Sequence, residues 1–206
     1  IPDTIRLENV LESFAEPDFG IKVGKIDMVQ GKAILIHLGS TQAYWVKEEY
    51  PLFKGDTVIT LKGGRIRLQL NDGSVLTLAS ETRLVINQSV YDPDAKTRSS
   101  FMGMAVGKAR FVVRKLHDAL QSDFKIKTQT AVVGVRGSDF IVEADADATK
   151  VVTLDDTRLE IISLADPKME QTVLNDYEKI VVGQDTMPSA VESVSIEDAK
   201  QIMREM

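Results

Sequence analysis

Residues 55–86 read GDTVITLKGGRIRLQLNDGSVLTLASETRLVI, and this stretch decides the fold class. Polar and apolar side chains alternate along it, as they do in a strand with one buried face. Four positions recur at a spacing of nine residues: Gly55, Gly64, Gly73 and Thr82. Gly and Asn-Asp-Gly residues, which tolerate the positive φ of tight turns, separate the alternating segments. The stretch therefore predicts four short strands, as in a meander, a sandwich, a barrel or a solenoid-like winding. A calcium-binding nonapeptide roll is not expected, because its GGxGxD ligand pattern is missing.

Strand-like patterns continue on both sides of this stretch. Further strands are expected at residues 22–29, 32–38, 43–47, 107–116, 123–130, 131–135, 140–144, 150–154, 158–164, 171–174 and 178–182. Residues 87–100 are polar, and we expect a connection there with a turn at Asp92-Pro93. The sequence thus predicts an all-β fold, a rolled or solenoid-like twisted β winding, with a β-sandwich as the alternative.

Both ends of the chain carry helical patterns. Apolar residues at helical spacing predict a short helix over Thr4–Phe14. Ser195 is a suitable N-cap, with Asp198 three residues later, for a second helix that ends near Met206. We therefore divide the chain into an N-terminal helical extension (1–19), a β domain (20–185), and a linker with a C-terminal helix (186–206).

Composition excludes several kinds of site. The 206 residues contain no cysteine, which rules out zinc–thiolate centres, iron–sulfur clusters, thiol nucleophiles and disulfides. No stretch approaches the roughly 18 consecutive apolar residues of a membrane-spanning helix. The chain begins at Ile1 rather than methionine, so we expect that preceding residues were removed, an anchor or export signal among the candidates.

The net charge of −6 is unevenly distributed. Residues 95–127 contain eight basic and two acidic residues, whereas residues 139–206 contain 16 acidic and six basic residues. The basic part could bind an anionic partner, and the acidic part a basic one. Solvated strand faces and loops are the simpler interpretation. Nucleic-acid binding is not expected, because aromatic residues that could stack on bases are sparse.

No catalytic, cofactor-binding or metal-binding constellation is recognisable. His37 lies in an apolar strand, where a hydrogen-bonded and partly buried histidine is the ordinary outcome, and His117 has no ligand at metal-binding spacing. Asp145 and Asp147 resemble the opening of a calcium loop, but the required glycine and glutamate are absent. We therefore interpret residues 145–149 as a hairpin turn. A hydrolase is suggested only by the many unassigned carboxylates, and we expect no enzyme.

Three segments, in order, resemble the FecR-type domain, named for the ferric-citrate signalling protein of bacterial envelopes. They are LFKGDTVIT (52–60), GRIRLQLNDGSVLTL (64–78) and TQTAVVGVRGSDFIV (128–142). Weaker similarity at 23–36 and 149–159 extends the resemblance over roughly residues 20–185. The most specific element is GVRGSDF (134–140), whereas the KGD and DGS pieces are common in β proteins.

The resemblance identifies a set of motif residues with an expected structural role: Gly55, Asp56, Asp72, Gly73, Gly134, Arg136, Gly137 and Asp139. Gly134 and Gly137 predict a sharp turn or a close approach of two backbones. Arg136 lies between apolar neighbours, so its guanidinium is expected to point inward or across a strand pair, with Asp139 and Asp56 as candidate partners. If Arg136 has a structural role, its replacement by alanine should lower stability; if it binds a ligand, binding alone should be lost.

The resemblance also implies a location and two alternative functions. It places the domain outside the cytoplasmic membrane, in the periplasm or at the cell surface of a bacterium. The first hypothesis is a non-catalytic interaction or signalling module that binds a protein partner in the envelope. The alternative is a structural or adhesive surface component that binds glycan or assembles with itself. No cofactor is implied, and neighbouring genes would discriminate between the two hypotheses.

Overall fold

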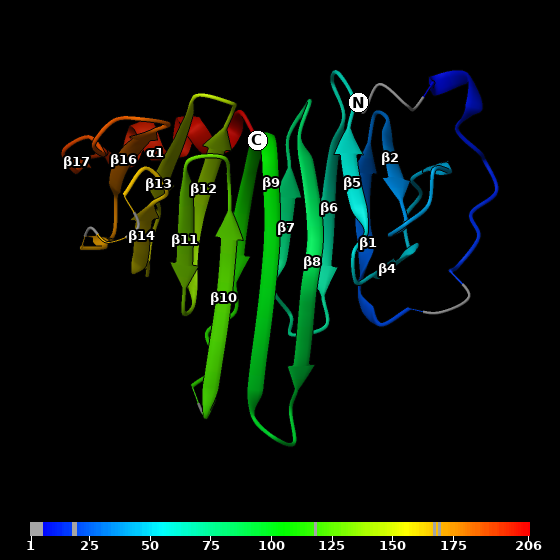
Figure 1. The fold of residues 1–206 in the computed structure, drawn as a ribbon, viewed down its shortest axis with the longest axis horizontal. Coiled ribbons are helices and arrows are strands. Elements are labelled where there is room, and N and C mark those ends of the chain that lie inside the picture. The colour runs from blue at the N-terminus through cyan, green and yellow to red at the C-terminus, as the bar shows by residue number, and fades with distance from the viewer. Residues whose placement is uncertain (1–5, 18–19, 118, 167, 169) are drawn as a thin grey trace.

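In the part of the chain that the structure describes, seventeen strands join into one open, mixed sheet that folds into two layers in this computed structural model (Figure 1). The structure describes residues 6–17, 20–117, 119–166, 168 and 170–206. The first layer contains β2 (Ala33–Ile36), β3 (Ala43–Trp45), β5 (Thr57–Thr60), β8 (Arg83–Asp92), β10 (Gln121–Lys127), β11 (Ala131–Val135), β14 (Leu159–Ser163) and β15 (Thr172–Leu174). The second contains β1 (Lys22–Gln30), β4 (Pro51–Phe53), β6 (Arg65–Leu70), β7 (Val75–Leu78), β12 (Ser138–Ala144), β13 (Ala148–Thr153), β16 (Glu178–Gly183) and β17 (Glu192–Ser193).

Strand β9 (Thr97–Val113) belongs to both layers. Residues 97–106 pair with β8 and β10, whereas residues 107–113 pair with β7 and β12. The change of layer occurs at Gly107, which has a φ of +110° and lies so close to Thr82 that a Cβ atom would overlap the Thr82 backbone. The Thr82 hydroxyl fixes this crossing, since it both accepts from the Lys108 N–H and donates to the Lys108 carbonyl, each at 3.0 Å.

One continuous apolar core fills the space between the layers. It forms because alternate residues of each strand point inward; in β6, Ile66, Leu68 and Leu70 are buried. Phe111 and Phe140 stack within this core, with ring centroids 5.3 Å apart. The predicted all-β winding is confirmed, and its two layers enclose a shared core.

Helix α1 (Ile196–Arg204) covers part of the outer face of the second layer (Figure 1). Ala199 and Met206 pack there against outward-facing Ile141 and Val152. The predicted N-cap is confirmed, because the Ser195 hydroxyl accepts from the Asp198 N–H at 3.0 Å. Among the described residues, no helix has the length and apolar character needed to cross a membrane.

Two local predictions were wrong. Within the described part of Thr4–Phe14, only Leu7–Asn9 is helical, as a 3₁₀ turn, and the segment then runs extended and bridges Leu11 to Tyr44. Its apolar residues are spaced for contact with the sheet, with Val10 buried against the first layer. Residues 87–100 form the β8–β9 hairpin rather than a connection, although the turn at Asp92-Pro93 is correct.

The other expected strands are present, most with ends shifted by a few residues, and the one expected at 107–116 is the second half of the longer β9. The turn between β12 and β13 is confirmed as well, because Asp145 Oδ1 accepts the N–H groups of Asp147 and Ala148 at 2.8 Å. These two hydrogen bonds stabilise the ionised carboxylate and lower the pKa of Asp145. The domain boundaries after residues 19 and 185 remain a prediction.

Candidate functional site

The candidate site surrounds Arg98, a buried arginine near the start of β9. The alternation of this strand points Arg98 inward with Ser100 and Met102, and its exposed fraction is 1%. Its guanidinium stacks over the ring of Phe124, 5.5 Å from the centroid. A buried guanidinium needs a counter-ion and acceptors for its N–H groups, because burial removes its hydration.

Four separate segments supply the partners of Arg98. Nη1 donates to Asp72 Oδ2 at 3.1 Å and to the Arg114 carbonyl at 2.7 Å. Nη2 donates to Ser122 Oγ at 2.7 Å and to the Arg136 carbonyl at 3.5 Å. The guanidinium therefore connects the β6–β7 turn, the end of β9, strand β10 and the β11–β12 turn.

Asp72 is as buried as Arg98, and its carboxylate accepts three hydrogen bonds. Besides the arginine, it accepts the N–H of Ser74 at 2.8 Å and the Ser74 hydroxyl at 2.9 Å. Ser74 Oγ in turn accepts the N–H of Arg114 at 3.1 Å. The DGS sequence thus fastens the β6–β7 turn to the end of β9.

Two motif glycines allow their turns to pack closely against residues 114 and 115. Gly137 has a φ of +147°, and a Cβ atom there would lie 2.7 Å from Lys115 Cα. Gly73 has a φ of +84°, with the Arg114 side chain 3.2 Å from where a Cβ would lie. Gly134, by contrast, is an ordinary residue of β11 with room for a Cβ, so the predicted turn or close approach is wrong at this position.

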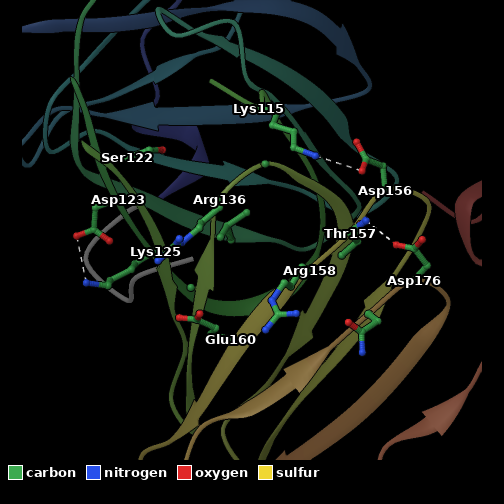
Figure 2. A pocket seen from close by; sticks show the side chains of 14 residues that line it. Lys115, Ser122, Asp123, Lys125, Arg136, Asp156, Thr157, Arg158, Glu160 and Asp176 are labelled. Carbon is green, nitrogen blue, oxygen red and sulfur yellow. Dashed lines mark hydrogen bonds and ion pairs between the residues drawn. The ribbon is translucent and has the colours of Figure 1, made fainter. Parts of the chain in front are cut away.

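A cleft of about 690 Å³ opens above this buried network (Figure 2). Two ion pairs lie along its wall, Lys115 with Asp156 at 3.5 Å and Lys125 with Asp123 at 3.1 Å. The carboxylate of Asp176 accepts the N–H of Thr157 at 2.6 Å. The remaining charged lining residues are Arg136, Arg158 and Glu160.

The prediction for the Arg136 side chain was wrong. The side chain is exposed at the cleft, and only its backbone carbonyl faces the buried network. Neither predicted partner is available to it, because Asp139 and Asp56 each pair with another residue. At the turn that contains Gly137, the Arg136 carbonyl points to Arg98 and the Arg136 side chain points to solvent.

A second pocket, of about 310 Å³, adjoins the cleft at Lys115. Lys96, Arg114 and His117 also line it, together with Tyr91 and Leu116. Among the described residues that line this pocket, none is acidic. Tyr91, Pro93 and Lys96 of this pocket belong to the β8–β9 hairpin, which projects at the lower end of the sheet in Figure 1.

Asp139 pairs with Arg110 across β9 and β12. The contact is bidentate, with Arg110 Nε donating to Oδ1 at 2.8 Å and Nη2 donating to Oδ2 at 2.6 Å. The hydrogen bond to Asp139 raises the pKa of Arg110 above its ordinary value. This pair links two strands of the second layer and takes no part in the cleft.

Asp56 pairs with His37 and takes no part in the Arg98 network. Asp56 Oδ1 lies 2.7 Å from His37 Nδ1, and Oδ2 accepts the Phe53 N–H at 2.8 Å. His37 Nε2 donates to the Ala15 carbonyl at 3.0 Å, which fastens the N-terminal segment. Burial raises the pKa of Asp56, while the contacts with His37 and Phe53 act in the opposite direction. The sequence-based expectation of a hydrogen-bonded, buried His37 is confirmed.

Gly55 lies next to this pair and lets its backbone approach the side chain of Leu38 closely. Its φ is +88°, and a Cβ atom would lie 2.6 Å from Leu38 Cβ. The eight motif residues are therefore distributed over three places, around Arg98, around Arg110 and around His37. Sequence reasoning missed Arg98, which it counted among the exposed charges of residues 95–127.

The site has the chemistry of a binding surface. Among the residues that the structure describes, no group of three or more His, Asp or Glu side chains is arranged to hold a metal ion. The arrangement offers exposed guanidinium and ammonium groups, two of them on residues whose backbone carbonyls Arg98 holds, and guanidinium groups bind carboxylates through paired hydrogen bonds.

Comparison with known proteins supports the family resemblance. The FecR protein family matches residues 56–157. Two crystal structures of a candidate anti-sigma factor from Parabacteroides distasonis, at 2.50 Å and 1.65 Å resolution, share the fold with a TM-score of 0.55 and 19% sequence identity. The match covers 71% of this chain and 63% and 64% of those chains, so the chain spans less than two thirds of their length. Among curated proteins, no sequence matches.

Proposed function

We propose that this chain is a non-catalytic signalling module that binds a protein partner in the bacterial envelope, because its residues 56–157 match the FecR protein family. The proposal places the domain outside the cytoplasmic membrane, in the periplasm or at the cell surface. The fold shared with a candidate anti-sigma factor supports a regulatory role.

One observation carries the proposal. Motif residues Asp72, Gly73 and Gly137 position the loops around Arg98. The charged residues that line the cleft above these loops are fully or partly exposed to solvent. A catalytic site would place its motif side chains at the reacting atoms, within hydrogen-bond reach of a substrate. Motif residues that support loops are typical of a domain whose loops contact another molecule.

Photocrosslinking in the bacterium that makes the protein would test this proposal. A photoreactive amino acid replaces Leu120, which is 83% exposed and whose N–H donates to the carbonyl of Lys96 beside the second pocket. The matched control carries the same probe at Lys62, in the β5–β6 turn. The proposal predicts that the protein fractionates with the envelope and that the Leu120 probe gives one adduct with another protein.

Two results would contradict the proposal. If the protein fractionates with the cytoplasm, the location is wrong. If every adduct is a covalent multimer of this chain, the protein assembles with itself, and the alternative of a structural surface component replaces the signalling module.

A further inference from the structure

The two pockets around Lys115 form one cationic end, defined here by Lys96, Arg114, Lys115, Lys125, Arg136 and Arg158. Four carboxylates line the same pockets, those of Asp123, Asp156, Glu160 and Asp176. The described lining residues thus have more basic than acidic side chains, although the net charge of the whole chain is −6. The basic side chains predominate around the second pocket. Such a local excess attracts anionic groups even when the whole protein is acidic.

Four of the cationic side chains have no partner among the described residues. Lys115 and Lys125 are each paired with an aspartate, whereas Lys96, Arg114, Arg136 and Arg158 make no side-chain hydrogen bond or ion pair there. All four are exposed. Three are arginines, whose planar guanidinium presents two parallel N–H groups to a carboxylate.

The buried Arg98 holds two of these arginines in place. Its guanidinium binds the backbone carbonyls of both Arg114 and Arg136, so the two residues are anchored from below by the same group. A buried ion pair contributes little net stability, because desolvation of both ions offsets their attraction. Its effect here is to fix the positions of the two loops, and pre-organised loops lose less entropy on binding.

We propose that the cationic end docks an acidic, extended segment of the protein partner, with Arg114, Arg136 and Arg158 binding its carboxylates. This inference rests on the proposed function, because it specifies where the partner binds. The exposed arginines line two concave pockets, of about 690 and 310 Å³, and a narrow chain segment enters such pockets more readily than a flat membrane surface does. Tyr91, Pro93 and Leu116 add apolar contacts suited to a polypeptide.

A peptide titration tests this inference with the intact chain. The probe is a fluorescein-labelled decaglutamate peptide, and binding is followed by fluorescence anisotropy at low salt. One variant combines Arg114→Gln, Arg136→Gln and Arg158→Gln. The control combines Lys54→Gln, Lys62→Gln and Lys200→Gln, which removes the same charge from exposed positions elsewhere. We expect the arginine variant to bind about tenfold more weakly or worse, and the control to stay within about twofold of wild type.

Each other outcome overturns the inference. Absence of peptide binding by the wild-type chain, or equal weakening in both variants, would show that the cationic end has no special affinity for carboxylates. Preferential binding of phosphatidylglycerol vesicles or of inorganic phosphate would assign the site to phosphate. Thermal melting verifies that the variants are folded, as expected for exposed side chains. The function proposal would survive these failures if the Leu120 probe still captured an envelope protein.

Discussion

Arg98 is the residue on which the candidate site depends most. It connects four segments of the chain through one guanidinium, and Asp72, its counter-ion, is completely buried. Breaking a buried ion pair is costly because the remaining charge stays in an apolar environment without compensation. The same pair is therefore a sensitive point for stability, although its formation contributes little.

Arg98→Met should lower the free energy of unfolding by about 3–5 kcal/mol, because Asp72 is left buried and unpaired. Urea denaturation at neutral pH measures this loss. Adding Asp72→Asn to the same chain should recover part of the stability, since the stranded charge is then removed. A loss below about 1 kcal/mol in the single variant would show that Asp72 is not electrostatically dependent on Arg98.

Asp56→Asn tests the buried pair with His37. Burial raises the pKa of Asp56 above its ordinary value of 3.8, so the folded state holds the proton more tightly than the unfolded state. The resulting stabilisation is complete below pH 3.8 and is lost as the pH rises through the raised pKa. The stability of wild type relative to Asp56→Asn should therefore decline as the pH increases, as followed by urea denaturation across a pH series. A relative stability that rises with pH would contradict this account.

At the residue scale, the sequence could identify which residues matter but not how they pair. Asp56, Asp72 and Asp139 were each singled out, and each pairs with a basic side chain in the structure. The partners His37, Arg98 and Arg110 lie 19 to 29 residues away in the chain. Their proximity depends on how β2, β5, β7, β9 and β12 pair, which no local pattern reveals.

At the scale of elements, β9 holds the two layers together. Its crossing needs the backbone conformation of Gly107 and the space that its missing side chain leaves for Thr82. The Thr82 hydroxyl then replaces ladder hydrogen bonds that the crossing interrupts. A long strand that changes layers explains why the fold is a continuous winding and not two separate sheets.

Gly107→Ala should destabilise the protein by more than about 2 kcal/mol, because its φ and its contact with Thr82 both exclude a Cβ atom. Gly63→Ala is the matched control, since Gly63 also has a positive φ, of +73°, but open space around it. The control should lose only about 1–2 kcal/mol, the usual cost of a left-handed alanine. Equal losses in urea denaturation would show that the contact with Thr82 is unimportant.

Most strands could be predicted because one face of each is buried, which imposes the alternation of polar and apolar residues. The β8–β9 hairpin was missed because small polar side chains such as Ser89 and Ser100 occupy its buried positions and hydrogen-bond to each other at 3.2 Å. The N-terminal helix was wrong because contacts with the sheet outweighed a weak local helical pattern. Both errors arise from tertiary contacts that local sequence does not encode.

At the scale of the whole molecule, the residues that stabilise the fold are different from the residues that are exposed for binding. The apolar core holds the two layers together and the buried ion pair positions the loops, while Arg114, Arg136 and Arg158 are exposed just after β9, just after β11 and just before β14. The uneven charge distribution along the sequence suggested a docking region, and the basic residues of 95–127 do contribute to the cationic end. Arg136 and Arg158 come from outside that region, so folding assembles the surface from segments that the sequence keeps apart.

The central claim is that motif residues support a surface whose exposed arginines bind the partner, and Arg136→Ala tests it most directly. The variant is measured twice, by thermal melting and by the yield of the envelope adduct from the Leu120 probe. The account predicts a melting temperature within about 2 °C of wild type, because removing an exposed side chain changes stability by about 0.5 kcal/mol or less, together with a reduced adduct yield. A melting temperature lower by many degrees with an unchanged adduct yield would contradict it and restore a purely structural role for Arg136.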